Sequence, residues 1–258
     1  MRAFTLLAMV VVSSVFGLVT AQEAKVVLGK PLPGGGVACP ALKTGYFPNT
    51  TGGIDALDLT TGKVLWSSKE ANRPLVAAEA GVLAQRTEKG KPNQIRVVIL
   101  HAGQQGKRTF ESQPIVFPDW VSVEIAYGRT FHTGVRGDGK RIWLAWSANA
   151  FYAGGAAPPP EVEKAARKSA SGVARVDLTT GKVEMLTAEQ IAIDKASSIA
   201  GEAVNSKVGT LTLTLKDGPA KNAKNPFERR RTLQALNDAK EVVWQHDIAA
   251  PVFLPPRP

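Results

Sequence analysis

The chain has 258 residues, a formal net charge of +10 at pH 7, 24 glycines, 17 prolines and a single cysteine. One cysteine excludes an intramolecular disulfide, so the fold must be held by a packed core, and the length suffices for one such core or several small repeated ones. The positive charge favours anionic surfaces or polymers as partners.

Residues 1–21 have the pattern of a secretory signal peptide. Arg2 is followed by an apolar run over residues 6–19 and by the small residue Ala21. This run is too short to cross a bilayer, which takes about 20 apolar residues. We therefore expect cleavage after Ala21, export to the periplasm or the extracellular space, and a single mature domain, residues 22–258, without a transmembrane segment. Export also argues against nucleic acid as a partner.

A segment of about 13 residues occurs four times in the mature chain. Two copies share the identical run Asp-Leu-Thr-Thr-Gly-Lys-Val. Each copy predicts a β-hairpin, because alternating apolar residues precede a turn in which, for example, Asp58 can bond turn amides and Gly62 can adopt a positive φ. The four copies are residues 54–66, 98–110, 172–185 and 231–244.

Further strands precede the later hairpins, so that each unit is predicted to be a four-stranded meander. The predicted strands are 74–78 and 82–86 in the second unit, 121–127 and 130–135 in the third, and 211–215, followed by a turn at 216–218, in the fourth.

The order of strand, glycine turn, strand and Ala-Leu-Asp-x-x-Thr-Gly-Lys-x-x-Trp resembles the blade repeat of the pyrroloquinoline-quinone-like, or quinoprotein-like, β-propeller family. The resemblance implies an all-β fold of about four antiparallel four-stranded blades, with blade tryptophans packed between neighbouring sheets. Three arrangements remain open: a small closed propeller, an open arc, and an open half that pairs with a second copy as a homodimer. The residues that carry the match are Leu57, Asp58, Gly62, Lys63 and Trp66, with Asn237 and Trp244 in the last copy.

The spacing of the repeats indicates an enlarged third unit. Gly62 and Gly106 are 44 residues apart, whereas Gly106 and Gly181 are 75 apart. The excess falls near residues 153–170, where glycines and prolines precede a stretch that can form a short helix. We interpret this region as a loop insertion between blade strands, and residues 219–227 as a second, exposed loop insertion.

No catalytic, cofactor-binding or metal-binding residue is predicted, and no cofactor is expected. The three histidines lack metal-ligand spacing, and no phosphate-binding or nucleophile motif occurs. We therefore expect an exported non-catalytic binding or scaffold protein whose partner is a protein or an anionic envelope polymer. The family resemblance also suggests a quinone-dependent dehydrogenase, but the adjacent cysteine pair common in such enzymes cannot exist with one cysteine.

The aromatic third unit is the densest candidate binding surface. Aromatic platforms stack on sugar faces, and polar neighbours add hydrogen bonds. A protein that binds carbohydrate or envelope polymer, or a hydrolase, is therefore an alternative function, unless these aromatic side chains fill the core instead. The candidate residues are Asp119, Trp120, His132, Arg136, Trp146 and Tyr152.

Overall fold

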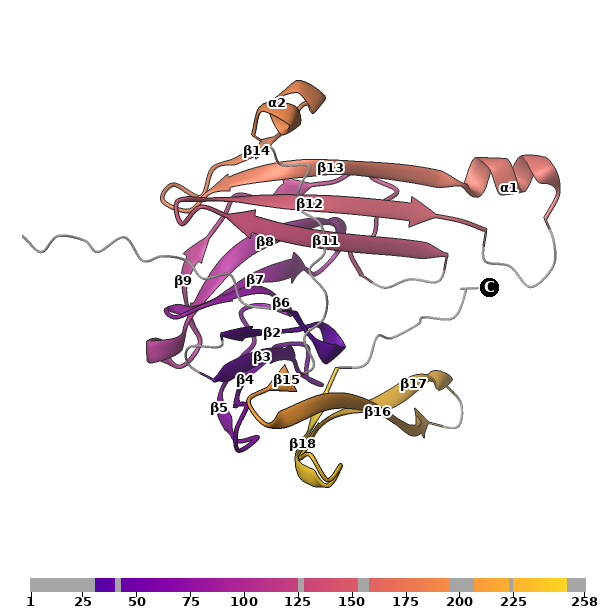
Figure 1. Cartoon of the computed structure of the whole chain (residues 1–258). Helices are drawn as coiled ribbons and strands as arrows, with labels where there is room; N and C mark the ends of the chain where they lie inside the picture. Colours follow the sequence, from indigo (N-terminus) through magenta and orange to yellow (C-terminus); the bar gives the residue numbers. More distant parts are fainter. Residues whose placement is uncertain are drawn as a thin grey trace, which may run out of the picture.

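The structure, a computed structural model, describes residues 31–39, 43–124, 128–152, 158–194, 207–222 and 225–249. These residues form four antiparallel sheets that follow one another along the chain (Figure 1). The prediction of an all-β chain with four antiparallel units is confirmed. The predicted signal peptide lies outside the described residues.

The first sheet contains the first predicted hairpin, formed by its last two strands. The three strands ahead of that hairpin were not predicted, because their residues are buried almost without alternation. The sheet has the order β1 (Pro31–Leu32), β2 (Gly36–Cys39), β3 (Thr44–Pro48), β4 (Ile54–Asp58) and β5 (Val64–Ser68), with a 3-10 turn, η1 (Pro33–Gly35), after β1.

The second sheet confirms the two predicted strands and the hairpin of the second unit. Its order is β10-β8-β7-β6, and β9 also pairs with β8. The elements are β6 (Arg73–Ala78), β7 (Gly81–Glu88), β8 (Lys91–His101), the 3-10 turn η3 (Ala102–Gln104), β9 (Lys107–Glu111) and β10 (Ile115–Val116).

The third sheet differs from the prediction at its start. Residues 121–124 form no strand, and their alternating apolar residues Val121 and Val123 pack into the core from an irregular segment. Residues 125–127 lie outside the described part. The strand missed by the prediction is β12, whose aromatic residues had suggested a binding surface. The sheet has the order β11 (Arg129–Gly137), β12 (Arg141–Ala150), β13 (Lys168–Asp177) and β14 (Val183–Met185).

Two short helices accompany the third sheet. Helix α1 (Pro160–Ala166) lies between β12 and β13, where the first insertion was predicted, and α2 (Ala188–Ile193) follows β14. Residues 153–157 of that insertion are outside the described part. None of the described helices is long and apolar enough to span a membrane.

In the fourth sheet, two segments that were predicted to be irregular form strands. The predicted turn at 216–218 is wrong, because β16 continues through it with register shifts between Asp217 and Asn222. The predicted loop at 219–227 is likewise strand up to Asn222 and from Asn225, so the second insertion lengthens a hairpin. The order is β15 (Lys207–Val208), β16 (Leu211–Asn222), β17 (Asn225–Leu236) and β18 (Val242–Ile248).

The sheets pack in the order fourth, first, second, third. Separate hydrophobic clusters join the fourth sheet to the first, the first to the second, and the second to the third. No cluster of described residues joins the third sheet to the fourth, and Figure 1 shows them at opposite ends of the molecule. This arrangement is consistent with a propeller-like fold.

The repeated tryptophans pack between sheets, as predicted. The Trp244 ring of the fourth sheet covers Gly62 of the first, where an added Cβ would lie 2.7 Å from the ring, and Trp66 of the first sheet covers Gly106 of the second in the same way. Trp244 Nε1 also donates a hydrogen bond of 3.1 Å to the carbonyl oxygen of Leu59. At these two junctions, the hairpin glycine of one sheet contacts the tryptophan on the last strand of its neighbour.

The hairpin turns of the third and fourth sheets, which are the two ends of the stack of sheets, do not make the Trp–Gly contact. Gly181 of the third sheet faces the backbone carbonyl of Glu111 rather than an aromatic ring. Met185, which ends the third sheet, is 42% exposed, and the turn of the fourth hairpin has Lys240 in the left-handed conformation instead of a glycine. The Trp–Gly contact therefore cannot be repeated between the third and fourth sheets.

Candidate functional site

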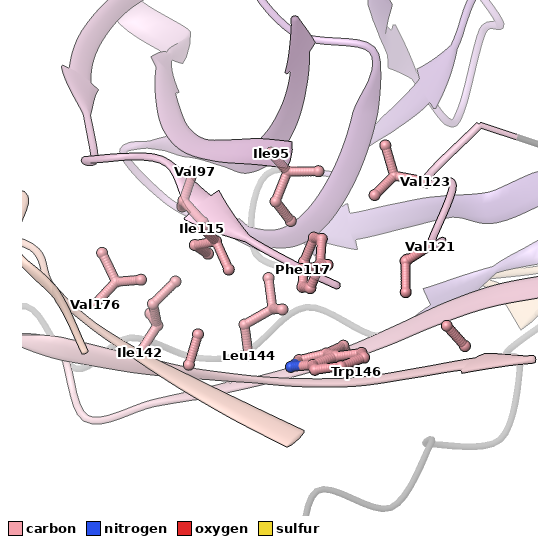
Figure 2. Close-up of a cluster of buried hydrophobic side chains, with 12 residues drawn as sticks. Ile95, Val97, Ile115, Phe117, Val121, Val123, Ile142, Leu144, Trp146 and Val176 are labelled. Carbon is pink, nitrogen blue, oxygen red and sulfur yellow. The ribbon is translucent and has the colours of Figure 1, made fainter. Parts of the chain in front are cut away.

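Two of the predicted binding residues belong to the core. Trp146 is 7% exposed and lies between the second and third sheets, with its ring centroid 5.0 Å from that of Phe117 (Figure 2). Trp120 packs against the same cluster from the irregular segment before β11. Trp146 is therefore a core residue rather than a platform for a sugar, and Trp120, which is partly buried, packs against the same core.

The remaining candidates are dispersed. Asp119 is exposed and accepts a long hydrogen bond, 3.4 Å, from Asn93, while Tyr152 is 39% exposed just past the end of β12. His132 is exposed on β11, on the same face as Arg136 and on the opposite face from Trp146. The structure therefore does not bring the six predicted residues to one surface.

A different site emerges from the register of the third sheet. Arg136 on β11 pairs with Trp143 on β12, Trp143 pairs with Arg175 on β13, and Arg175 pairs with Glu184 on β14. Paired residues in an antiparallel sheet project from the same face. These four side chains thus form a row across the whole sheet, on the face turned away from the second sheet. We call this face the outer face.

Trp143 is the centre of the row. The guanidinium carbons of Arg136 and Arg141 lie 5.0 Å and 5.3 Å from the centroid of its ring, within the range of cation–π attraction. Trp143 is itself only 7% exposed. A ligand that approaches the outer face therefore meets arginine side chains rather than an open aromatic platform.

Asp194, immediately after α2, ties the helix to this row. One of its carboxylate oxygens accepts hydrogen bonds from Trp143 Nε1 at 3.0 Å and from Arg175 at 2.9 Å, and its carbonyl oxygen accepts one from Arg136 at 2.8 Å. The bond from Trp143, supported by the charge of Arg175, holds the pKa of Asp194 below its ordinary value. The carboxylate therefore stays ionised at neutral pH.

Helix α2 has its own local support. Thr187 and Gln190 form a capping box at its start, and the Gln190 side chain also donates a 3.0 Å hydrogen bond to Glu184. Leu186 and Ile191 pack with Trp143 in a small cluster on the outer face. The helix consequently covers part of the outer face of the third sheet.

Beside the row lies an open hollow of about 220 Å³, lined by Arg141, Arg175, Asp177, Lys182 and Glu184. Asp177 is committed to its own turn, since its carboxylate accepts the amides of Thr179 and Thr180 at 2.9 Å and 2.7 Å. The same bonds, led by that from Thr180, lower the pKa of Asp177. The aspartates of the repeat thus have the structural role predicted for them.

The three cations of the hollow differ in how firmly they are paired. Arg141 pairs with Asp138 at 2.9 Å, but both side chains are substantially exposed, and such pairs exchange readily with solvent ions. Lys182 is exposed, and its ammonium group has no hydrogen bond or ion pair with any described residue. Arg175 is held by Glu184 and Asp194. The lining therefore carries three cations against the carboxylates of Asp177 and Glu184, and Lys182 and Arg141 are the cations that can bind a carboxylate, sulfate or phosphate group.

Sequence reasoning identified Arg136, and counted Trp143 among the aromatic residues of the third unit, but missed Arg175 and Glu184. The signal was the alternation within residues 141–147, which places Trp143 and Trp146 on opposite faces of a strand. Asp194 could not have been found, because it lies 51 residues after Trp143 and reaches it only through the path of α2.

Within the described ranges, no group of three or more His, Cys, Asp or Glu side chains could hold a metal ion. No family model matches the chain, and no curated protein matches it significantly.

Proposed function

We propose that the chain is an exported, non-catalytic binding or scaffold protein built on quinoprotein-like propeller blades, and that the outer face of its third sheet binds acidic groups of a protein or an envelope polymer. The observation that carries the proposal is the hollow in which Arg141, Arg175 and Lys182 converge.

The blade assignment draws support from the contacts between sheets. The contacts of Trp244 with Gly62 and of Trp66 with Gly106 place the same repeat positions in the same packing geometry at two junctions between sheets. An open arc of blades, in the order fourth, first, second and third, accounts for these contacts and for the exposed Met185 at the end of the third sheet.

Charge supports an acidic partner. Removal of the predicted signal peptide takes away Arg2 and lowers the formal net charge only from +10 to +9. An overall positive field speeds the approach of an anionic partner, and its effect weakens as salt is added. The hollow would then recognise the ligand locally. There an anionic group of the ligand can replace the water around Lys182, or replace Asp138 as the partner of the solvent-exposed Arg141.

The test is retention of the mature protein, residues 22–258, on polygalacturonate, with neutral dextran as the matched polymer. We expect retention on polygalacturonate alone, and its loss in the double variant Arg141→Gln/Lys182→Gln. The control Lys63→Gln/Lys89→Gln removes the same charge from exposed positions on the first and second sheets. If both double variants weakened retention equally, retention would depend on net charge alone, and a site on the third sheet would be refuted.

A further inference from the structure

A second group of polar side chains lies at the β6 edge of the second sheet, away from the outer face of the third. Arg73 on the edge strand β6 pairs with Gln85 on β7, so their side chains share one face of the sheet. Leu83, two residues before Gln85 on the same strand, packs into the core between the second and third sheets. Arg73 and Gln85 therefore face the third sheet.

Both side chains have unmet hydrogen-bonding capacity. Gln85 is 2% exposed, and its Oε1 accepts no hydrogen bond within the described structure. Arg73 is half-buried and forms no hydrogen bond or ion pair with a described residue. Burial lowers the pKa of Arg73, and no carboxylate among the described residues offsets that effect. A guanidinium stays charged even when it is partly buried, so an anion beside it would be stabilising.

The facing strand adds a third unsatisfied group. Thr133 on β11 pairs with Trp146, whose side chain lies in the core between the two sheets, so Thr133 faces the second sheet as well. Its hydroxyl is buried without a partner among the residues described. Strands β6 and β11 lie against each other. The interface thus offers donors from Arg73 and Thr133 and an acceptor from Gln85.

We propose that β6 and β11 form a binding site for a small carboxylate that also carries a hydroxyl or ammonium donor. The carboxylate would accept hydrogen bonds from Arg73 and Thr133, and the donor would bond Gln85 Oε1. One guanidinium among apolar neighbours such as Leu75 and Leu83 matches a single negative charge, whereas a phosphate dianion would bring a second, uncompensated charge into the interface.

Calorimetry with lactate, propionate and lactamide tests the ligand chemistry. We expect lactate to bind. Propionate, which lacks the donor, should bind about tenfold more weakly because Gln85 Oε1 stays unpaired, and lactamide, which lacks the charge, should not bind. No heat with lactate, or equal affinity for lactate and lactamide, would overturn the proposal.

Variants test the residues. Arg73→Met should abolish lactate binding, whereas Lys89→Met, which removes an exposed charge from the same sheet, should leave it unchanged. Gln85→Glu places a carboxylate beside Arg73 and should raise the melting temperature without ligand while it eliminates lactate binding. Gln85→Glu tests the proposed lactate site if Arg73→Met fails to fold. Wild-type affinity in either variant would contradict the site.

Discussion

At the scale of single residues, the junction between the first and fourth sheets contains a polar clamp inside an otherwise apolar contact. Asp55 of the first sheet is 7% exposed and accepts hydrogen bonds from Asn49 at 2.8 Å and, in the appropriate tautomer, from His246 of the fourth sheet at 3.0 Å. A buried carboxylate is tolerated only when such partners replace its water. Asp55 therefore joins the two sheets as a satisfied polar pair.

This clamp predicts acid sensitivity. Burial by itself would raise the pKa of Asp55, but hydrogen bonds from His246, Asn49 and Ser67 outweigh it and hold the pKa below its ordinary value. A carboxyl group with a lowered folded pKa stabilises the fold above its unfolded pKa of about 4, and this contribution is lost as the pH falls through the folded value. Stability should thus fall with pH below about 4.

Urea unfolding at pH 7 and pH 3 measures this effect. Asp55→Asn should lower the free energy of unfolding at pH 7 by about 1–3 kcal/mol and reduce the difference between the two pH values. Asp238→Asn, an exposed change of the same kind on the last hairpin, should have little effect at either pH. An unaltered pH dependence in Asp55→Asn would show that other carboxyl groups govern acid unfolding.

At the scale of elements, the Trp–Gly contact predicts that Gly62 must be a glycine for two reasons. One is its left-handed backbone, and the other is the lack of space for a Cβ beside Trp244, and the two can be measured separately. Gly62→Ala introduces a Cβ into the left-handed conformation, at φ +72°, and also drives it into the Trp244 ring. Gly52→Ala introduces the same atom at φ +85° with nothing within 4 Å. Both variants carry the conformational cost of about 1–2 kcal/mol, and only Gly62→Ala adds overpacking of about 1–3 kcal/mol.

Thermal or urea unfolding of the two glycine variants gives the comparison. Gly62→Ala should be the less stable of the two. When it is measured relative to Trp244→Leu alone, which vacates the ring position, the further cost of Gly62→Ala should fall to about that of Gly52→Ala. If Gly62→Ala and Gly52→Ala were equally stable, the tryptophan contact would contribute nothing to the choice of glycine.

Elements were predictable where turn chemistry is local. Asp58 and Gly62 lie four residues apart and satisfy one turn between them, so the hairpin was evident from the sequence. Val121 and Val123 alternate like strand residues, yet their segment is irregular, and both side chains pack into the core with Phe117 and Trp146. The outer face likewise depends on cross-strand register, which sets Arg136 beside Trp143 and Trp143 beside Arg175. No local pattern encodes that register across an insertion.

At the scale of the whole molecule, each described sheet is joined by a hydrophobic cluster only to its neighbours in the stack. The stability of such repeat architectures is approximately a sum of unit and interface contributions, so a defect stays near the junction where it is made. The position of the fourth sheet is set by its junction with the first, where Trp244, Leu233 and Ile248 are buried. An open arc and a closed ring therefore respond differently to damage at that junction.

Trp244→Ala distinguishes the two arrangements. Truncation of this buried ring should cost about 3–5 kcal/mol at the junction of the first and fourth sheets. In an open arc, amide hydrogen exchange should rise in residues 207–249 and in β4 and β5, while β11, β12 and β13 keep their protection. In a closed ring, the third sheet would lose a neighbour as well. Faster exchange in β11 to β13 would therefore contradict the open arrangement and place the third sheet in contact with the fourth.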